Sequence, residues 1–587
     1  MLLPALVAVA LTQAPPPLTT LSEQSGWLRT GRATESEALC RAFAKAYPSK
    51  ARCDTVGTTP EGRPLLALIA SADGTLTPAA ARKKNRPVVF FQGGIHAGEI
   101  DGKDAGYWLL RDLLSGKEQP DVLKGVTAVF VPIFNVDGHE RFGPNNRPNQ
   151  RGPEEMGFRV TGQGYNLNRD YTKVEAPEMG ALLTYLNAWE PLVYMDLHVT
   201  DGAKFEHDVS VSLEPQKGGP ESLRPLGVKL REDLFQTLES EGHLPVEFYP
   251  SFRQDDDPAS GFAYGIAPPR FSHGYWMQHG RFGVLVETHS WKPYAHRVKT
   301  TRDILASVLQ QVARDGAALQ AAVKAEDARA ESGQVKEAVL SWEGTQKNHP
   351  IAFRGYAYER GLSELSGQPW VRYDESKPQV WTVPYYDEVK PGLTVSLPAG
   401  GYLIPPAYAA WAAQKLTAHG LRFERLTKSL LPTDVELFRA TDVQFNARSF
   451  EGRQGVTLKG AWSQESRAIP AGTLYVPTAQ KGVQLVAQLL EPTGADSWAA
   501  WGLFNNAFEQ KEYIEDYVVE PFARELLAKD ARVKAEWEER LKDPAFAKDP
   551  RARLRFFAER HPAFDAAFRL YPVFRVSTAP TAPTAAR

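Results

Sequence analysis

The chain has few cysteines, no excess of charge of either sign and no long hydrophobic run. Only two of its 587 residues are cysteine, Cys40 and Cys53, which excludes a disulfide-rich scaffold and a zinc site built of four cysteines. The 68 lysines and arginines stand against 70 acidic residues, so there is no basic field to hold a nucleic acid. No apolar run reaches the roughly 18 residues of a spanning helix, and we expect no membrane span.

The rest of the composition is that of a large globular protein. Apolar residues make up 43% of the chain and charged residues 24%, which supplies large cores and excludes wholesale disorder. At about 100–200 residues per domain, the length suits about two or three domains. Nine of the 12 histidines lie between His96 and His296, and this clustering indicates that the chemistry is in the first half of the chain.

The amino terminus has most features of an export signal. Residues 2–11 form a short apolar run, small residues follow as cleavage options, and a polar, proline-rich stretch comes next. The run is not preceded by Lys or Arg, and a buried amino-terminal segment is the alternative. We expect a signal peptide over 1–20 and a secreted or periplasmic protein, in which Cys40 and Cys53 are joined.

Short apolar runs alternate with helical patterns in the first half of the chain. The runs cover 87–95, 126–135, 191–197 and 282–288. Short, continuously apolar strands separated by helices are typical of a parallel sheet covered on both faces. We predict an α/β fold with a mostly parallel or mixed sheet, in a domain over 21–330 that closes with a long helix around 301–330.

The character of the sequence changes at about residue 335. Stretches at 380–406 and 455–477 alternate as solvated antiparallel strands do, and the pattern turns helical from about 480. We predict an accessory α+β domain over 335–576 and a disordered tail over 577–587. This half of the chain carries no chemistry that the sequence identifies.

Three of the four apolar runs lead into residues that suit a metal site. The first run leads into His96, with Glu99 three residues on. The third leads into His198, and the fourth ends at Glu287. In an open α/β sheet, sites form beyond the carboxyl ends of the strands, so these side chains are expected at one edge. Two His and one Glu make a three-ligand zinc site, and a second Glu beside it can act as general base.

Five segments together resemble the zinc carboxypeptidases, a family of metallopeptidases. They are GGIHAGEIDGKDA, NVDGHE, GYNLNRDY, DLHVTDG and GVLVETHS, in that order within roughly 55–320. The resemblance implies a catalytic first domain with one zinc ion per chain. It implies that the zinc ligands are His96, Glu99 and His198. It also implies that Glu287 is the general base.

The resemblance further implies which residues contact the substrate. Asn168 and Arg169 are expected to bind the terminal carboxylate of a peptide, which suits the planar fork of arginine. An arginine after NVDGHE is expected to polarise the scissile carbonyl. Arg147 is our choice for it, with Arg151 and Arg159 as alternatives.

A tyrosine about two dozen residues before the catalytic glutamate is also implied. Tyr264 fits this position, and Tyr275 is the alternative. His289 shares strand parity with Glu287 and is a candidate to support the site from behind. For the other candidates near the site in sequence, positions at the surface or with satisfied hydrogen bonds are expected: Asp201, His207, His273 and His279.

One departure from the family pattern affects the expected specificity. Many members have Arg directly before the first glutamate ligand, where this chain has Gly98. We expect a metallocarboxypeptidase that hydrolyses the C-terminal bond of a peptide, with an amidase or deacylase on the same site as the alternative. A secreted binding protein without turnover is the second alternative, against which the intact set of ligands and base argues. Cobalt or manganese would also suit the ligands.

Overall fold

The first half of the chain is built on one eight-stranded sheet. The computed structural model describes residues 18–581 and 584–585, so nearly all of the expected signal peptide lies outside the described residues. The strand order is β1-β2-β4-β3-β5-β9-β6-β7, with β4, β3, β5 and β9 parallel at the centre. β2 and β6 join this centre as antiparallel neighbours. The predicted α/β fold with a mostly parallel or mixed sheet is confirmed.

The four central strands of this sheet, β3, β4, β5 and β9, follow the four predicted apolar runs, and the other four strands flank them. Their bounds are Ala51–Thr58 (β1), Pro64–Ala70 (β2), Val88–Gly93 (β3), Thr127–Val131 (β4), Val193–Thr200 (β5), Val209–Glu214 (β6), Pro245–Val246 (β7) and Phe282–His289 (β9).

Helices cover both faces of the sheet. Because side chains alternate along a strand, Val89 and Phe91 of β3 enter one hydrophobic cluster while Val88 and Phe90 enter another. The first face is covered by α2 (Ala33–Ala46), α4 (Asp101–Ser115), α5 (Val122–Gly125), α8 (Arg224–Ser240) and α10 (Tyr294–Glu331). The second face is covered by α7 (Pro177–Trp189) and α9 (Ser272–Gln278). Shorter helices are α1 (Leu21–Gln24), α3 (Pro78–Lys84) and α6 (Val136–Glu140).

The second half of the chain shares a core with the first. It contains a seven-stranded sheet of order β17-β16-β19-β14-β18-β15-β20 and a β10–β13 pair. Its α11 (Pro406–Ala418) and α12 (Val483–Leu490) pack toward α7 and α9, and their apolar residues belong to the same cluster as the second face of the first sheet. The strands are β10 (Glu337–Gly344), β13 (Val389–Ser396), β14 (Gly401–Ile404), β15 (Glu424–Leu426), β16 (Leu430–Phe445), β17 (Val456–Ile469), β18 (Leu474–Pro477), β19 (Phe574–Val576) and β20 (Thr584–Ala585). The last of these pairs with β15, within the stretch expected to be a disordered tail.

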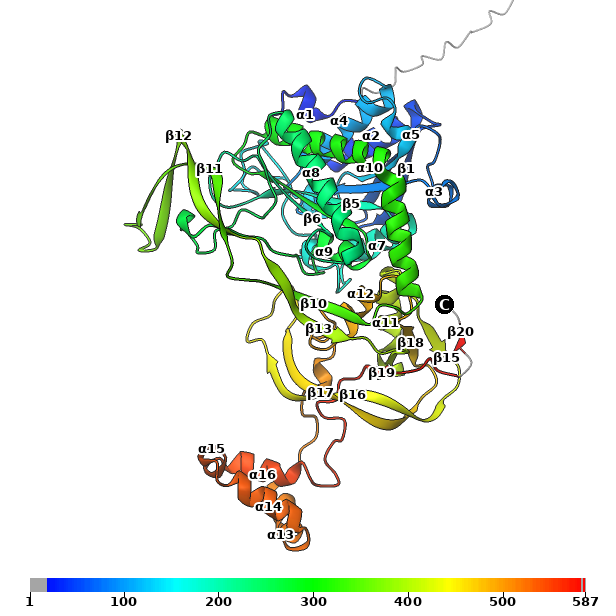
Figure 1. The fold of residues 1–587 in the computed structure, drawn as a ribbon, viewed down its shortest axis with the longest axis vertical. Helices are drawn as coiled ribbons and strands as arrows, with labels where there is room; N and C mark the ends of the chain where they lie inside the picture. The colour runs from blue at the N-terminus through cyan, green and yellow to red at the C-terminus, as the bar shows by residue number, and fades with distance from the viewer. Residues whose placement is uncertain (1–17, 582–583, 586–587) are drawn as a thin grey trace, which may run out of the picture.

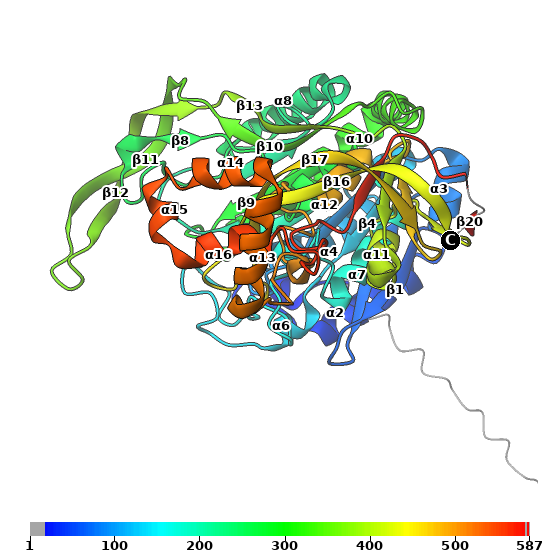
Figure 2. The same cartoon turned by 90° about the horizontal axis from the view of Figure 1, so that it is seen from below.

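Two parts of the second half project from it. The long hairpin of β11 (His349–Leu362) and β12 (Pro369–Tyr386) reaches back to the first half, where β12 pairs with β8 (Phe262–Ala263). The second part is a separate group of helices that stands away from the sheets (Figure 1) and, seen from below, lies in front of them (Figure 2). It consists of α13 (Asp516–Lys529), α14 (Ala531–Arg540), α15 (Pro544–Lys548) and α16 (Pro550–Ala558).

A disulfide joins α2 to β1. Cys40 and Cys53 are bonded with their Cα atoms 5.5 Å apart, as expected for an exported chain. None of the helices in the described part of the chain combines the length and hydropathy that crossing a membrane requires.

Candidate active site

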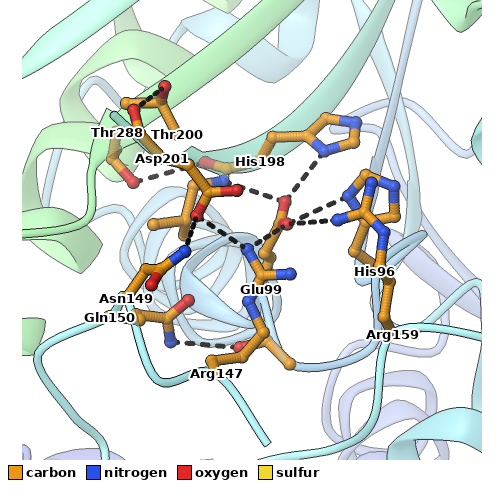
Figure 3. A network of polar contacts seen from close by, with 12 residues as sticks. His96, Glu99, Arg147, Asn149, Gln150, Arg159, His198, Thr200, Asp201 and Thr288 are labelled. Carbon is orange, nitrogen blue, oxygen red and sulfur yellow. Dashed lines mark hydrogen bonds and ion pairs between the residues drawn. The ribbon is translucent and has the colours of Figure 1, made fainter. Parts of the chain in front are cut away.

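Three ligand side chains converge at the carboxyl ends of the central strands. His96 and Glu99 lie in the loop between β3 and α4, and His198 lies on β5. The Nδ1 atom of His96 is 2.9 Å from Oε1 of Glu99, and Nδ1 of His198 is 2.9 Å from Oε2 (Figure 3). All three side chains are buried, and their ligand atoms lie within 4.8 Å of one another. The structure therefore brings the three predicted ligands together.

The surroundings of these ligands fit a zinc ion. Nε2 of His198 lies 2.9 Å from Oδ2 of Asp196, and a carboxylate on the far nitrogen orients an imidazole so that its other nitrogen faces a metal. Burial alone would raise the pKa of Glu99, but His96 and Arg147 hold it well below its usual value. The carboxylate is therefore ionised, as a zinc ligand must be. Two nitrogens and one carboxylate leave a fourth position for water.

Glu287 stands directly beside this cluster. β5 and β9 are parallel neighbours, and their register places Glu287 opposite His198. The side chain is buried, and burial raises the pKa of Glu287 to about 8. A carboxyl group of this kind can both accept and release a proton near neutral pH.

A cavity of about 610 Å³ opens over the cluster. Five of the predicted site residues line it, namely His96, Glu99, Asn168, Arg169 and Glu287. The other lining residues are Arg159, Val199, Asp201, Ser212, Tyr249, Ser251, Phe252, Arg253, Ala263, Gly265, Ile266, Ala267, Phe271, His273 and Leu285.

Arg169 offers a free positive charge to this cavity. Its guanidinium packs on the ring of Phe271 at 4.3 Å and donates a 2.7 Å hydrogen bond to the carbonyl oxygen of Asn168. Within the described chain it makes no ion pair with a carboxylate. Burial, together with the nearby charges of Arg159 and Arg270, lowers the pKa of Arg169. A group in this position gains from a negatively charged ligand.

Arg147 supports a ligand from behind. Its Nη2 atom lies 2.7 Å from Oε1 of Glu99, and its side chain crosses directly over Gly98. A Cβ atom at Gly98 would come within 2.5 Å of Cγ of Arg147. Arg147 therefore brings a positive charge beside Glu99, in a chain that has no arginine at position 98. It is not among the residues that line the cavity.

Of the two alternatives for the carbonyl-polarising arginine, one faces the cavity. Arg159 lines it, with Nη1 3.7 Å from Oε1 of Glu99. Arg151 is engaged elsewhere, because it pairs with Glu375 at 2.7 Å and packs on the ring of Trp291. The geometry favours Arg159 over Arg147 for contact with a substrate.

The predicted tyrosine does not reach the cavity. The hydroxyl of Tyr264 donates a 2.5 Å hydrogen bond to Glu214 and accepts one from Gln216, and only 4% of the residue is exposed. Tyr275 lies in the core. Tyr249, which is 41% exposed, lines the cavity instead. No motif marks Tyr249, so the sequence offered no signal for it.

Asp201 and some of the neighbouring histidines do not lie where the sequence predicted. His273 is buried and lines the cavity, and burial lowers its pKa to about 4. Asp201 lines the cavity as well and lies 3.7 Å from Arg147. The ring of His289 stacks on Phe205 at 4.1 Å and does not line the cavity.

Comparisons with known proteins find similarity to carboxypeptidases. Residues 36–203 match the family model described as zinc carboxypeptidase. Carboxypeptidase 2 of Trichophyton rubrum is 22% identical over 488 residues, 80% of this chain and 83% of that protein. An inactive metallocarboxypeptidase of Saccharomyces cerevisiae is 29% identical over 157 residues, 25% of this chain and 35% of that protein. The crystal structure of carboxypeptidase A from Helicoverpa armigera is 16% identical, with a TM-score of 0.36 over 48% of this chain and 74% of that one. Residues 36–203 therefore match the zinc carboxypeptidase family, in agreement with the resemblance of the motifs in that part of the chain.

Proposed function

We propose that the chain is a zinc-dependent hydrolase that removes residues from the carboxyl end of peptides. One observation carries the proposal. A convergent set of His96, Glu99 and His198 adjoins a cavity that is lined by the buried Glu287 and by an arginine that pairs with no carboxylate among the described residues. The first two features suit hydrolysis by an activated water, and the third suits a substrate with a free carboxylate.

Each residue has a role that follows from its place. His96, Glu99 and His198 would hold a zinc ion, and this ion would supply the Lewis acid that lowers the pKa of water to about 7. Glu287 takes the proton of the attacking water and passes it to the leaving amine. Arg159 donates hydrogen bonds to the oxygen on which negative charge develops, and it replaces Arg147 as our proposal for this role.

The other cavity residues position the substrate. Arg169 takes the terminal carboxylate by two parallel hydrogen bonds, and Asn168 adds a polar contact beside it. This anchoring holds the scissile carbonyl over the metal ligands and so reduces the entropy lost on reaching the transition state. Tyr249 replaces Tyr264 as the tyrosine that contacts the substrate.

Two alternative functions would use the same site. An amidase or deacylase would need the metal and Glu287 but not Arg169. A binding protein without turnover is supported by the inactive relative in yeast, although this chain keeps all three ligand side chains and the base.

The test compares peptides that differ only in a free or amidated carboxyl terminus, with and without a chelator. Cleavage of the free acid alone, abolished by the chelator and restored by zinc, is expected. Faster cleavage of the amide would favour the deacylase, and a zinc-loaded protein without turnover would favour the binding protein.

We propose in addition that the protein acts outside the cytoplasm. The apolar amino-terminal run and the Cys40–Cys53 bond support this placement. Mass spectrometry of the natural protein is the test. A chain that begins near residue 20 with both cysteines oxidised is expected, whereas an uncleaved chain with two free thiols would contradict it.

A further inference from the structure

A second group of metal-ligating side chains lies outside the active site. Asp208 precedes β6, His243 lies between α8 and β7, and His296 is in the first turn of α10. Oδ2 of Asp208 is 2.7 Å from Nδ1 of His243 and 2.9 Å from Nε2 of His296. One carboxylate oxygen therefore faces two imidazole nitrogens, and the three side chains come from three separate parts of the sequence.

We propose that Asp208, His243 and His296 bind a divalent transition-metal ion, with zinc as the best fit. Two imidazole nitrogens and a carboxylate oxygen are a donor set that zinc prefers. The three ligand atoms already lie within 4.8 Å of one another. Zinc holds such atoms at about 2.0–2.2 Å, so they would need to separate by only about half an ångström to admit the ion.

The residues behind the cluster orient its ligands for a metal. Oδ2 of Asp303 lies 3.1 Å from Nε2 of His243, which is the arrangement that directs the other ring nitrogen toward a metal. Asp303 is itself held by Lys299 at 2.6 Å. The N–H of Leu244 donates a 2.8 Å hydrogen bond to Oδ1 of Asp208, so that Oδ2 faces the two histidines. The active site has a similar arrangement, in which the carboxylate of Asp196 lies behind His198.

Charge and access also suit a cation here. Asp208 is 3% exposed, and within the described residues no lysine or arginine forms an ion pair with it. A dication would therefore supply the positive charge that no lysine or arginine brings to this buried carboxylate. The side chain of His296 is 41% exposed, which gives the ion a path of entry and leaves a coordination position for water.

An ion at this place would act as a structural link. The carbonyl oxygen of Asp208 accepts a 2.9 Å hydrogen bond from the N–H of His289 on β9, and two residues on, Ser210 pairs in register with Glu287. The ion would thus tie the start of α10 and the loop after α8 to the strand that borders β9. Its expected effect is on stability, because none of its ligands lines the active-site cavity.

Zinc binding by the full chain tests the proposal. Protein freed of metal is dialysed against zinc, and the bound zinc per chain is measured for wild type, His296→Gln and His349→Gln. Glutamine keeps a hydrogen-bond donor toward Asp208 but does not replace the imidazole as ligand. We expect His296→Gln to bind one zinc fewer than wild type and to keep the hydrolytic activity. His349→Gln is the matched control and should bind as much zinc as wild type. His349 is half-exposed, lies 3.5 Å from Asp387 and has no third metal-ligating side chain beside it among the described residues.

A second measurement does not depend on a variant. Anomalous scattering at the zinc edge should show a peak bounded by Asp208, His243 and His296, in addition to any peak at the active site. In solution, Asp303→Asn should weaken this second binding event by about 10–100-fold. His296→Gln protein that binds as much zinc as wild type would overturn the proposal. So would zinc-loaded crystals without this peak, or with the peak on the other side of His243, between Asp303 and Glu241.

Discussion

At the scale of single residues, Gly98 and Arg147 depend on each other. A Cβ atom at position 98 would meet the Arg147 side chain at 2.5 Å and the carbonyl oxygen of Gly157 at 2.6 Å. The absence of a side chain at Gly98 is therefore what allows Arg147 to reach Glu99. Arg147 thus brings a positive charge to Glu99 from a loop other than the one that carries Gly98 and Glu99.

Gly98→Ala should disturb both folding and metal binding. Because one of the two contacts is with backbone, the site must shift, at a cost of about 1–3 kcal/mol in the free energy of unfolding. Loss of the Arg147 contact with Glu99 should weaken zinc binding by about 10–100-fold. Denaturant unfolding and zinc titration check this. Gly265→Ala is the control, since Gly265 also lines the cavity but has room for a Cβ atom. Equal behaviour of the two variants would contradict the account.

Arg169 should decide whether a free carboxyl terminus is recognised. Arg169→Lys keeps the charge but loses the planar fork, so kcat/KM for free-acid peptides should fall by the equivalent of about 1.5–3 kcal/mol. Hydrolysis of amidated peptides, where present, should change little. Arg253→Lys is the control, because Arg253 lines the same cavity but packs on the ring of Tyr386. An equal loss on acid and amide substrates would show that Arg169 does not read the carboxylate.

At the scale of elements, parallel strands place the chemistry and the loops complete it. The register of β5 and β9 sets His198 opposite Glu287, and the end of β3 leads directly into His96. The loop that carries Tyr264 is held by β8, which pairs with β12 of the second half. The wall of the cavity thus depends on a hairpin more than a hundred residues away in sequence.

Two tyrosines of these loops should separate by function. Tyr249→Phe should lower kcat/KM about tenfold with little change in stability, because Tyr249 lines the cavity and is 41% exposed. Tyr264→Phe should lower the free energy of unfolding by about 1.5–3 kcal/mol, since it loses a buried hydrogen bond to Glu214, with kcat/KM unchanged. Kinetics and denaturant unfolding of both variants are the measurements. The opposite pattern would restore Tyr264 as the residue that contacts the substrate.

These loops also contain the parts of the site that could not be predicted from the sequence. The convergence of His96, Glu99, His198 and Glu287 could be predicted because apolar runs define strands, and the ends of parallel strands meet at one edge. The side chains of Tyr249 and Arg159 could not, because no periodicity fixes the direction of a side chain in an irregular loop. The contact between β8 and β12 was hidden for a similar reason. The local sequence pattern of a strand does not identify a partner strand that is distant in the sequence, as β12 is from β8.

At the scale of the whole molecule, the two halves unite around a common core. His419, which directly follows α11, is fully buried and lies 3.1 Å from the hydroxyl of Tyr275 on α9. Burial lowers the pKa of His419 to about 3, so this histidine is neutral when the halves are packed together. The contact is therefore sensitive to acid.

The pH dependence of stability should report this contact. The folded-state pKa lies below the value of about 6.5 for an unfolded chain, so the contribution of His419 is complete above pH 6.5. It is lost at about 1.4 kcal/mol per pH unit as the pH falls from 6.5 toward 3. In His419→Gln, the free energy of unfolding should therefore fall by about 1.4 kcal/mol less per pH unit than in wild type, between pH 6 and about 4.5. The exposed His349→Gln should leave it unchanged, and an unaltered slope in His419→Gln would contradict the prediction.

The most direct test of the whole account measures bound zinc and turnover together in Glu287→Gln. Because Glu287 lies beside the ligands and is not one of them, the variant should bind as much zinc as wild type. Its kcat should fall about 10²–10⁴-fold, which is the usual contribution of a general base. His198→Ala, the comparison, should lose one zinc and the activity together. If Glu287→Gln loses zinc along with activity, or keeps its activity, the proposed division between ligands and base is wrong.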